Sequence, residues 1–135
     1  MKILKLHFTI LAFIICTSVM NAQKEEKQNI TSVEFTGTEI ILNKKHAFNY
    51  EKSENNFQIK SLENKTLITG NIITLGENKW RSHIIFLTIN KEFTNQKIIG
   101  RNDLIFALCE NNVITKNFEI DDEKLKLFIS KYNEL

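Results

Sequence analysis

The sequence predicts a mainly β, α+β fold: a single antiparallel β-meander that forms a small barrel or sandwich, with one C-terminal amphipathic helix packed on it. Three observations support this prediction. Segments of alternating polar and apolar residues recur roughly every 8–12 residues, with turn residues between them. The chain has no proline, so its turns depend on asparagine and glycine, which tolerate positive φ. Clear helical periodicity occurs in one place, at the C-terminus.

Residues 1–22 have the pattern of a cleaved secretory signal peptide. Two lysines precede the apolar run Phe8–Cys16, and small or polar residues follow it. This run is shorter than the roughly 20 residues of a membrane-spanning helix, so we expect no stable membrane insertion after cleavage. Cleavage is expected after Ala22, or alternatively after Ser18. The mature protein should therefore be secreted or periplasmic, and its many isoleucines, asparagines and lysines indicate an AT-rich bacterial genome.

The mature chain is electrically neutral. The full sequence has 18 Lys+Arg and 16 Asp+Glu, and removal of the leader, with two lysines and no acid, leaves 16 of each. Nucleic-acid binding requires clustered basic residues, so no nucleic-acid partner is expected. The length fits one domain. We expect a disordered polar lead-in over 23–31 and a single β-rich domain over 32–135.

The strands are expected to follow one another along the chain. Alternation at Val33 and Phe35 begins the first, and a change of apolar phase at Gly37 marks a bulge or break before the second. Gly70 suggests a bend of the kind that barrels use at corners. The remaining predicted strands lie at 46–51, 57–62, 66–75 and 80–89, followed by a polar loop over 90–96.

The segment Asp103–Glu110 is ambiguous. As a strand it would pair with 113–120 through a type I′ turn at Asn111-Asn112. As a helix it would be capped by Asn102 or Asp103 and would end at Asn111. Its centre is apolar all round, so periodicity does not distinguish the two, and the turn favours the strand.

A helix is predicted over 122–134. Asp121-Asp122-Glu123 supplies an N-cap and negative charge at its start, and Lys131 lies near its end. Its apolar residues recur at the spacing of one helical face: Leu125, Phe128, Ile129 and Tyr132.

Cys109 is the one cysteine left after signal cleavage, so no intramolecular disulfide is possible. The apolar residues before it predict that it is buried. The alternative is a small thiol-dependent or hydrolytic enzyme in which His83, or else His46, removes the proton from Cys109. The sequence has no Cys-x-x-Cys, His-x-His or His-x-x-x-His spacing, so neither a metal site nor a cofactor is expected.

The aromatic residues are expected mainly in the core, with some available to line a ligand site. Phe48, Tyr50 and Trp80 are the candidates for a site that binds a small apolar ligand in the mouth of a barrel. Trp80, beside Arg81 at the start of a strand, is expected to be exposed. We therefore interpret the chain as a non-catalytic exported binding or interaction module, which takes either a small apolar ligand or a protein at a strand edge. A structural, envelope-associated domain is the third hypothesis.

Overall fold

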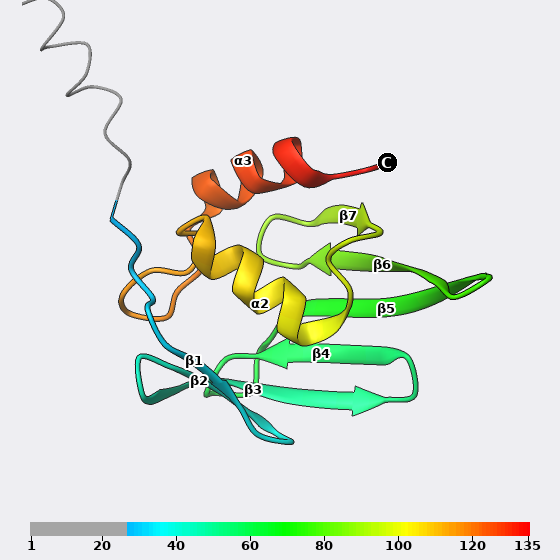
Figure 1. The fold of residues 1–135 in the computed structure, drawn as a ribbon. Helices are drawn as coiled ribbons and strands as arrows, with labels where there is room; N and C mark the ends of the chain where they lie inside the picture. Colours follow the sequence, from blue (N-terminus) through cyan, green and yellow to red (C-terminus); the bar gives the residue numbers. More distant parts are fainter. Residues whose placement is uncertain (1–26) are drawn as a thin grey trace, which may run out of the picture.

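The computed structural model describes residues 27–135, which form one antiparallel sheet and two helices (Figure 1). The strands pair in chain order, and the helices lie over one face of the sheet. The predicted mainly β, α+β class is confirmed, while the predicted signal peptide lies outside the described residues. The elements are β1 (Val33–Phe35), β2 (Glu39–Leu42), β3 (Lys45–Ser53), β4 (Asn56–Lys60), β5 (Thr66–Gly76), β6 (Lys79–Phe86), β7 (Lys91–Asn95), α2 (Gly100–Glu110) and α3 (Asp122–Tyr132).

The seven-stranded sheet is open. Its order runs from β1 to β7, and these two strands are its edges rather than partners of each other. A closed barrel needs its first and last strands to pair, so the expected barrel or sandwich is not confirmed. Register shifts interrupt the pairing at three places, between Ile40 and Ile41, between Ile59 and Lys60, and between Thr74 and Gly76.

The residues after α3 cover the outer edge of β7. The backbone N–H of Glu134 donates to the carbonyl of Thr94 at 2.8 Å, and the N–H of Thr94 donates to Oδ1 of Asn133 at 2.9 Å. The N–H of Gln96 donates to a carboxylate oxygen of Glu134 at 2.6 Å. These contacts satisfy backbone groups that would otherwise offer a template for another strand. The opposite edge, β1, is only three residues long.

The core lies between the sheet and the two helices. Three phenylalanines link its parts: the ring centroids of Phe86 and Phe93 are 5.9 Å apart, and those of Phe93 and Phe128 are 5.3 Å apart. These contacts join β6, β7 and α3. The largest fully buried side chains are Phe86, Phe93, Phe128, Ile30, Ile40, Leu42, Ile59, Ile68, Ile84, Leu104, Ile105 and Leu108.

The prediction of turns that contain asparagine is confirmed for two hairpins, whereas Asn111 ends α2 and does not form the predicted type I′ turn. Asn43 and Lys44 have φ angles of 50° and 64°, and Glu77 and Asn78 have φ angles of 50° and 60°. Two consecutive residues with positive φ form the type I′ turn whose twist matches that of the flanking strands. Asparagine adopts this conformation more readily than most other residues, so a chain without proline still forms tight hairpins.

Residues 103–110 form a helix, so the prediction of a strand there is wrong. In α2 the side chains of Leu104, Ile105, Leu108 and Cys109 are buried against the core. Phe106 lies on another side of the helix, where its ring contacts Phe35 of β1 edge-on at 5.7 Å. Because α2 makes apolar contacts on two sides, its sequence lacks the amphipathic period that would identify a helix.

Three further expectations differ from the structure. Residues 113–120 contain only an isolated bridge between Ile114 and Ile120 instead of a strand, and the predicted loop 90–96 contains β7. Within the lead-in, Ile30 is fully buried, and Oδ1 of Asn112 accepts a hydrogen bond from the N–H of Asn29 at 2.8 Å. These contacts join segments more than 80 residues apart, and local sequence patterns carry no information about them.

The predicted C-terminal helix is confirmed as α3. Asp121 caps it, accepting a hydrogen bond from the N–H of Lys124 at 3.1 Å. The helix ends at Tyr132 instead of residue 134, because Asn133 is extended and its side chain binds the edge of β7.

Candidate functional site on the open face of the sheet

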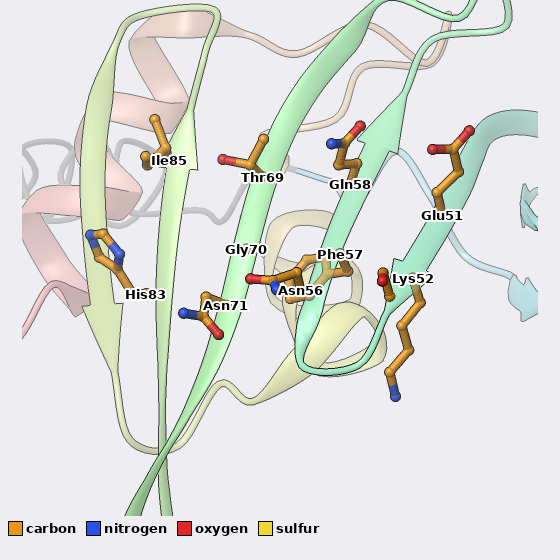
Figure 2. A pocket seen from close by; sticks show the side chains of 11 residues that line it. Glu51, Lys52, Asn56, Phe57, Gln58, Thr69, Gly70, Asn71, His83 and Ile85 are labelled. Carbon is orange, nitrogen blue, oxygen red and sulfur yellow. The ribbon is translucent and has the colours of Figure 1, made fainter.

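The sheet face opposite the helices carries two rows of side chains that cross β3, β4, β5 and β6 (Figure 2). The strand register places the residues of each row directly opposite one another. Side chains in such positions lie about 4.5–5.5 Å apart at Cβ, close enough to bind one ligand together. The first row is Glu51, Gln58, Thr69 and Ile85, and the second is Ser53, Asn56, Asn71 and His83.

These rows line a hollow of about 400 Å³, here called the open-face hollow. This volume falls in the range of roughly 300–1,000 Å³ that is typical of small-molecule sites. Lys52, Phe57 and Gly70 complete its lining.

Position 70 on β5 requires a glycine because Phe57, its partner on β4, leaves no room for a side chain. A Cβ atom built on Gly70 would lie 2.2 Å from the ring of Phe57, which packs over the glycine from the helix side. The pairing of β4 with β5 and of β5 with β6 continues through Gly70 without a register shift. Close approach of the ring, and not a barrel corner, therefore explains the glycine.

The centre of the open-face hollow is polar and largely uncharged. Among residues 27–135, the side-chain amides of Asn56 and Asn71 have no hydrogen-bond partner, and Gln58 has only a 3.5 Å contact with the hydroxyl of Thr66. Each amide offers two N–H donors and one carbonyl acceptor. The carboxylate of Glu51 is paired with Lys60 at 2.9 Å. The hollow therefore offers free amide donors and acceptors.

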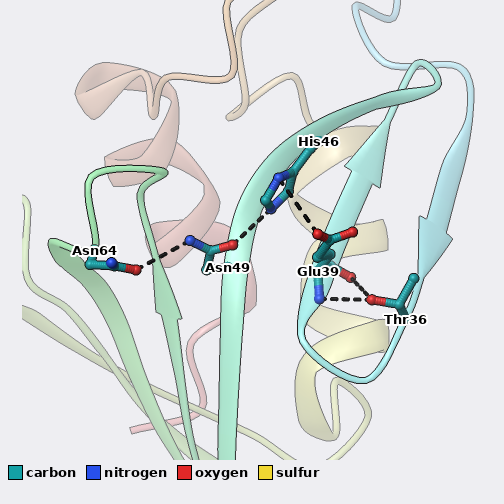
Figure 3. A network of polar contacts seen from close by, with 5 residues as sticks. All are labelled: Thr36, Glu39, His46, Asn49 and Asn64. Atoms are coloured by element: carbon teal, nitrogen blue, oxygen red, sulfur yellow. Dashed lines mark hydrogen bonds and ion pairs between the residues drawn. The ribbon is translucent and has the colours of Figure 1, made fainter.

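A separate polar network lies where β2, β3 and the β4–β5 turn meet (Figure 3). Nε2 of His46 lies 2.7 Å from Oδ1 of Asn49, and its Nδ1 lies 3.8 Å from a carboxylate oxygen of Glu39. The amide of Asn49 donates to Oδ1 of Asn64 at 3.2 Å. These groups bind one another and do not line the open-face hollow. We therefore assign the network a structural role, in which it links β2, β3 and the β4–β5 turn.

The structure does not bring Cys109 and His83 together. Cys109 is 1% exposed on the core side of α2, as predicted, and burial raises the pKa of its thiol to about 12, with a smaller contribution from the charge of Glu110. His83 points to the opposite face of the sheet, because its neighbours Ser82 and Ile84 are fully buried on the helix side. An imidazole on the far face cannot remove the thiol proton, so this arrangement gives the thiol-enzyme hypothesis no support.

The three aromatic candidates lie in three different places. Trp80 is 46% exposed, which confirms its predicted exposure, but it does not line the open-face hollow. Phe48 is 2% exposed and belongs to the core. Tyr50 is also on the helix side, with its ring 4.0 Å from the guanidinium carbon of Arg101. These residues therefore do not form one apolar ligand site.

The residues that sequence reasoning missed are the amides Asn56, Gln58 and Asn71. They alternate with the core residues of β4 and β5, and this alternation predicts only that they face away from the core. Which of them lie next to one another depends on the register of β4 with β5. Residues 27–135 contain no group of three or more potential metal ligands.

Neither helix of residues 27–135 has the length and apolar character of a membrane span. No known protein-family model, curated protein or solved structure matches the chain.

Proposed function

We propose that this protein is a non-catalytic exported binding module that holds an uncharged, hydroxyl-rich ligand, a short saccharide, in the open-face hollow. The observation that carries the proposal is the set of side-chain amides that converge on this hollow. Among residues 27–135, Asn56 and Asn71 have no hydrogen-bond partner, and Gln58 has only its 3.5 Å contact with Thr66. Export is inferred from the leader pattern of residues 1–22.

A saccharide fits the chemistry of these side chains. Its neighbouring hydroxyl groups both donate and accept hydrogen bonds, and an amide offers both functions in one plane. The hydroxyl of Thr69 adds another donor and acceptor, and Ile85 supplies an apolar surface for the C–H groups of a sugar ring. The one carboxylate that lines the hollow, Glu51, is neutralised by Lys60, so the hollow offers no unpaired negative charge to the ligand.

The same hollow lacks the groups that would cleave a saccharide. Glycoside hydrolysis generally uses two carboxyl groups that flank the scissile bond. The open-face hollow is lined by a single carboxylate, Glu51, and this group forms an ion pair with Lys60. Binding without turnover is therefore the function that this set of residues supports.

The test is an NMR titration of the ¹⁵N-labelled mature protein with neutral oligosaccharides of glucose, galactose, mannose and N-acetylglucosamine. A ligand is expected to produce saturable shifts at residues of β4, β5 and β6 that line the hollow. Gln58→Ala and Asn71→Ala should each weaken that binding by up to about tenfold, since a hydrogen bond contributes roughly 0.5–1.5 kcal/mol.

Asn117→Ala is the matched control, because Asn117 is an exposed asparagine outside the hollow. It should leave saccharide binding unchanged. If no oligosaccharide shifts these signals, or if all three variants bind equally well, the proposal is wrong. Detection of Met1 on the purified native protein by mass spectrometry would contradict export through a cleaved leader.

A further inference from the structure

A second hollow, of about 290 Å³, lies at the start of α2 on the helix side of the sheet. We call it the α2 hollow. Its polar lining comes from Tyr50 and Lys52 of β3 and from Gly100, Arg101 and Asn102 of α2. Phe57, Ile72 and Ile99 supply its apolar walls. It lies on the other face of the sheet from the open-face hollow, although Lys52 and Phe57 line both.

The start of α2 is not capped by a side chain. Its N-cap residue is Ile99, which has no oxygen in its side chain to accept a hydrogen bond. The backbone N–H groups of Arg101 and Asn102 have no acceptor among residues 27–135. Free N–H groups at a helix start, together with the positive end of the helix dipole, attract negative charge.

Arg101 is held rigidly beside these groups. Its guanidinium carbon lies 4.7 Å from the ring centre of Phe35 and 4.0 Å from that of Tyr50, and its Nη1 donates to the carbonyl of Thr36 at 2.9 Å. Its Nε donates to the side chain of Asn102 at 2.9 Å. A guanidinium has five N–H donors, so three remain for another acceptor.

No described carboxylate neutralises the positive charges of this hollow. Neither Arg101 nor Lys52 forms an ion pair within residues 27–135. The acid of the first turn of α2 is Asp103, whose carboxylate accepts a hydrogen bond from the N–H of Ile99 at 3.0 Å. Asp103 does not line the α2 hollow. Two cations therefore face the hollow without a counter-ion from the described chain.

Tyr50 gives an independent indication of a ligand. The residue is only 9% exposed, yet its hydroxyl has no hydrogen-bond partner among residues 27–135. The hydroxyl oxygen is not fully buried and Tyr50 lines the α2 hollow, so this oxygen is available to form a hydrogen bond with a group bound there.

The geometry points to a binding site for a tetrahedral oxyanion, a phosphate or sulfate group, in the α2 hollow. Four kinds of donor meet there: backbone N–H groups, a guanidinium, an ammonium and a phenol hydroxyl. An anion with several oxygens accepts from donors in several directions, and its negative charge is balanced by Arg101 and Lys52.

The test uses sodium phosphate and sodium sulfate, added separately to the ¹⁵N-labelled mature protein at low ionic strength. Sodium acetate and sodium chloride at matched ionic strength are the controls. Phosphate, sulfate or both should shift the amide signals of Arg101 and Asn102 saturably in the millimolar range. The N-terminus of α3 should not respond, since Asp121 caps it and Asp122 and Glu123 add negative charge.

Tyr50→Phe keeps the ring over which Arg101 is stacked and removes only the hydroxyl. It should weaken anion binding by about tenfold, the effect of losing a hydrogen bond to a charged group. Lys52→Gln should weaken it as well and should reduce its dependence on salt. Tyr132→Phe is the matched control, because Tyr132 does not line the α2 hollow, and it should bind the anion like the natural protein.

Three outcomes would overturn this inference. The first is the absence of a saturable response to either oxyanion. The second is equal affinity of Tyr50→Phe and Tyr132→Phe. The third is equal saturation by acetate, which would indicate a general anion effect. Gln58 does not line the α2 hollow, so Gln58→Ala should still bind the oxyanion. The saccharide proposal and the oxyanion proposal can therefore be tested independently.

Discussion

Consecutive residues of β5 and β6 point to opposite faces of the sheet, and the two faces have different chemistry. On β6, Ile84 and Phe86 are fully buried under the helices, whereas His83 and Ile85 line the open-face hollow. The helix face is filled by interlocking apolar side chains, in which each volume is fixed by its neighbours. The open face carries short polar side chains with free hydrogen-bonding groups. One alternating sequence thus supplies both the stability of the sheet and its proposed binding surface.

The largest difference between the faces is expected for adjacent residues of β6. Phe86→Ala should reduce the free energy of unfolding by about 3–5 kcal/mol, because it leaves a cavity beside Phe93 and the core. Ile85→Ala, one residue away on the open face, should cost less than about 1.5 kcal/mol, since Ile85 is only half-buried. Urea denaturation measures both variants. Equal losses would mean that the two faces are packed alike, contrary to the structure.

The next largest effect on stability is expected at Gly70, which lines the open-face hollow and is covered on the helix side by the ring of Phe57. Gly70→Ala should destabilise the fold by about 1–3 kcal/mol, because the new methyl group meets the ring of Phe57. Phe57→Ala removes that ring, so adding Gly70→Ala to it should cost much less than Gly70→Ala costs alone. A double-mutant cycle from urea denaturation measures this coupling. Additive losses would show that the ring does not impose the glycine.

Features that depend on nearby residues could be predicted from the sequence, whereas features that depend on contacts between distant segments could not. The β-rich class, the turns at Asn43 and Asn78 and the capped helix α3 follow from local patterns, because backbone conformation at these places depends on nearby residues. For α2 the strand was favoured over the helix because of the turn signal at Asn111-Asn112. Periodicity could not correct this, since the helix is apolar on two sides, one of which contacts Phe35. Whether the sheet closes depends on pairing between distant strands, which no local pattern specifies.

The candidate sites were less predictable than the fold. Asn56 and Asn71 are 15 residues apart in the sequence and become neighbours only through the register of β4 with β5. Cys109 and His83 were paired in the alternative enzyme hypothesis, but they lie on opposite sides of the sheet. The burial of Cys109 was predictable because its apolar neighbours precede it directly. Its distance from His83 was not, because that distance is set by which face of the sheet α2 covers.

The last expected effect concerns the pH dependence of the covered face, which begins only above pH 9. The pKa of Cys109 is raised by burial from 9.0 to about 12, so the folded protein keeps the thiol protonated where the unfolded chain begins to lose its proton. The stability linked to this group is fully present below pH 9 and is lost as the pH rises from 9 towards 12. The loss should be roughly 1.4 kcal/mol for each pH unit in that interval.

Cys109→Ala isolates this effect, because it removes the thiol and leaves every other ionisable group of the chain in place. The variant should be less stable than the natural protein at neutral pH, and the difference between them should shrink as the pH rises above 9. Urea denaturation across this pH range measures it, and labelling with a thiol reagent at neutral pH should proceed only as fast as the protein unfolds. Rapid labelling of the native protein would place Cys109 at the surface and would contradict its burial on the helix side of the sheet.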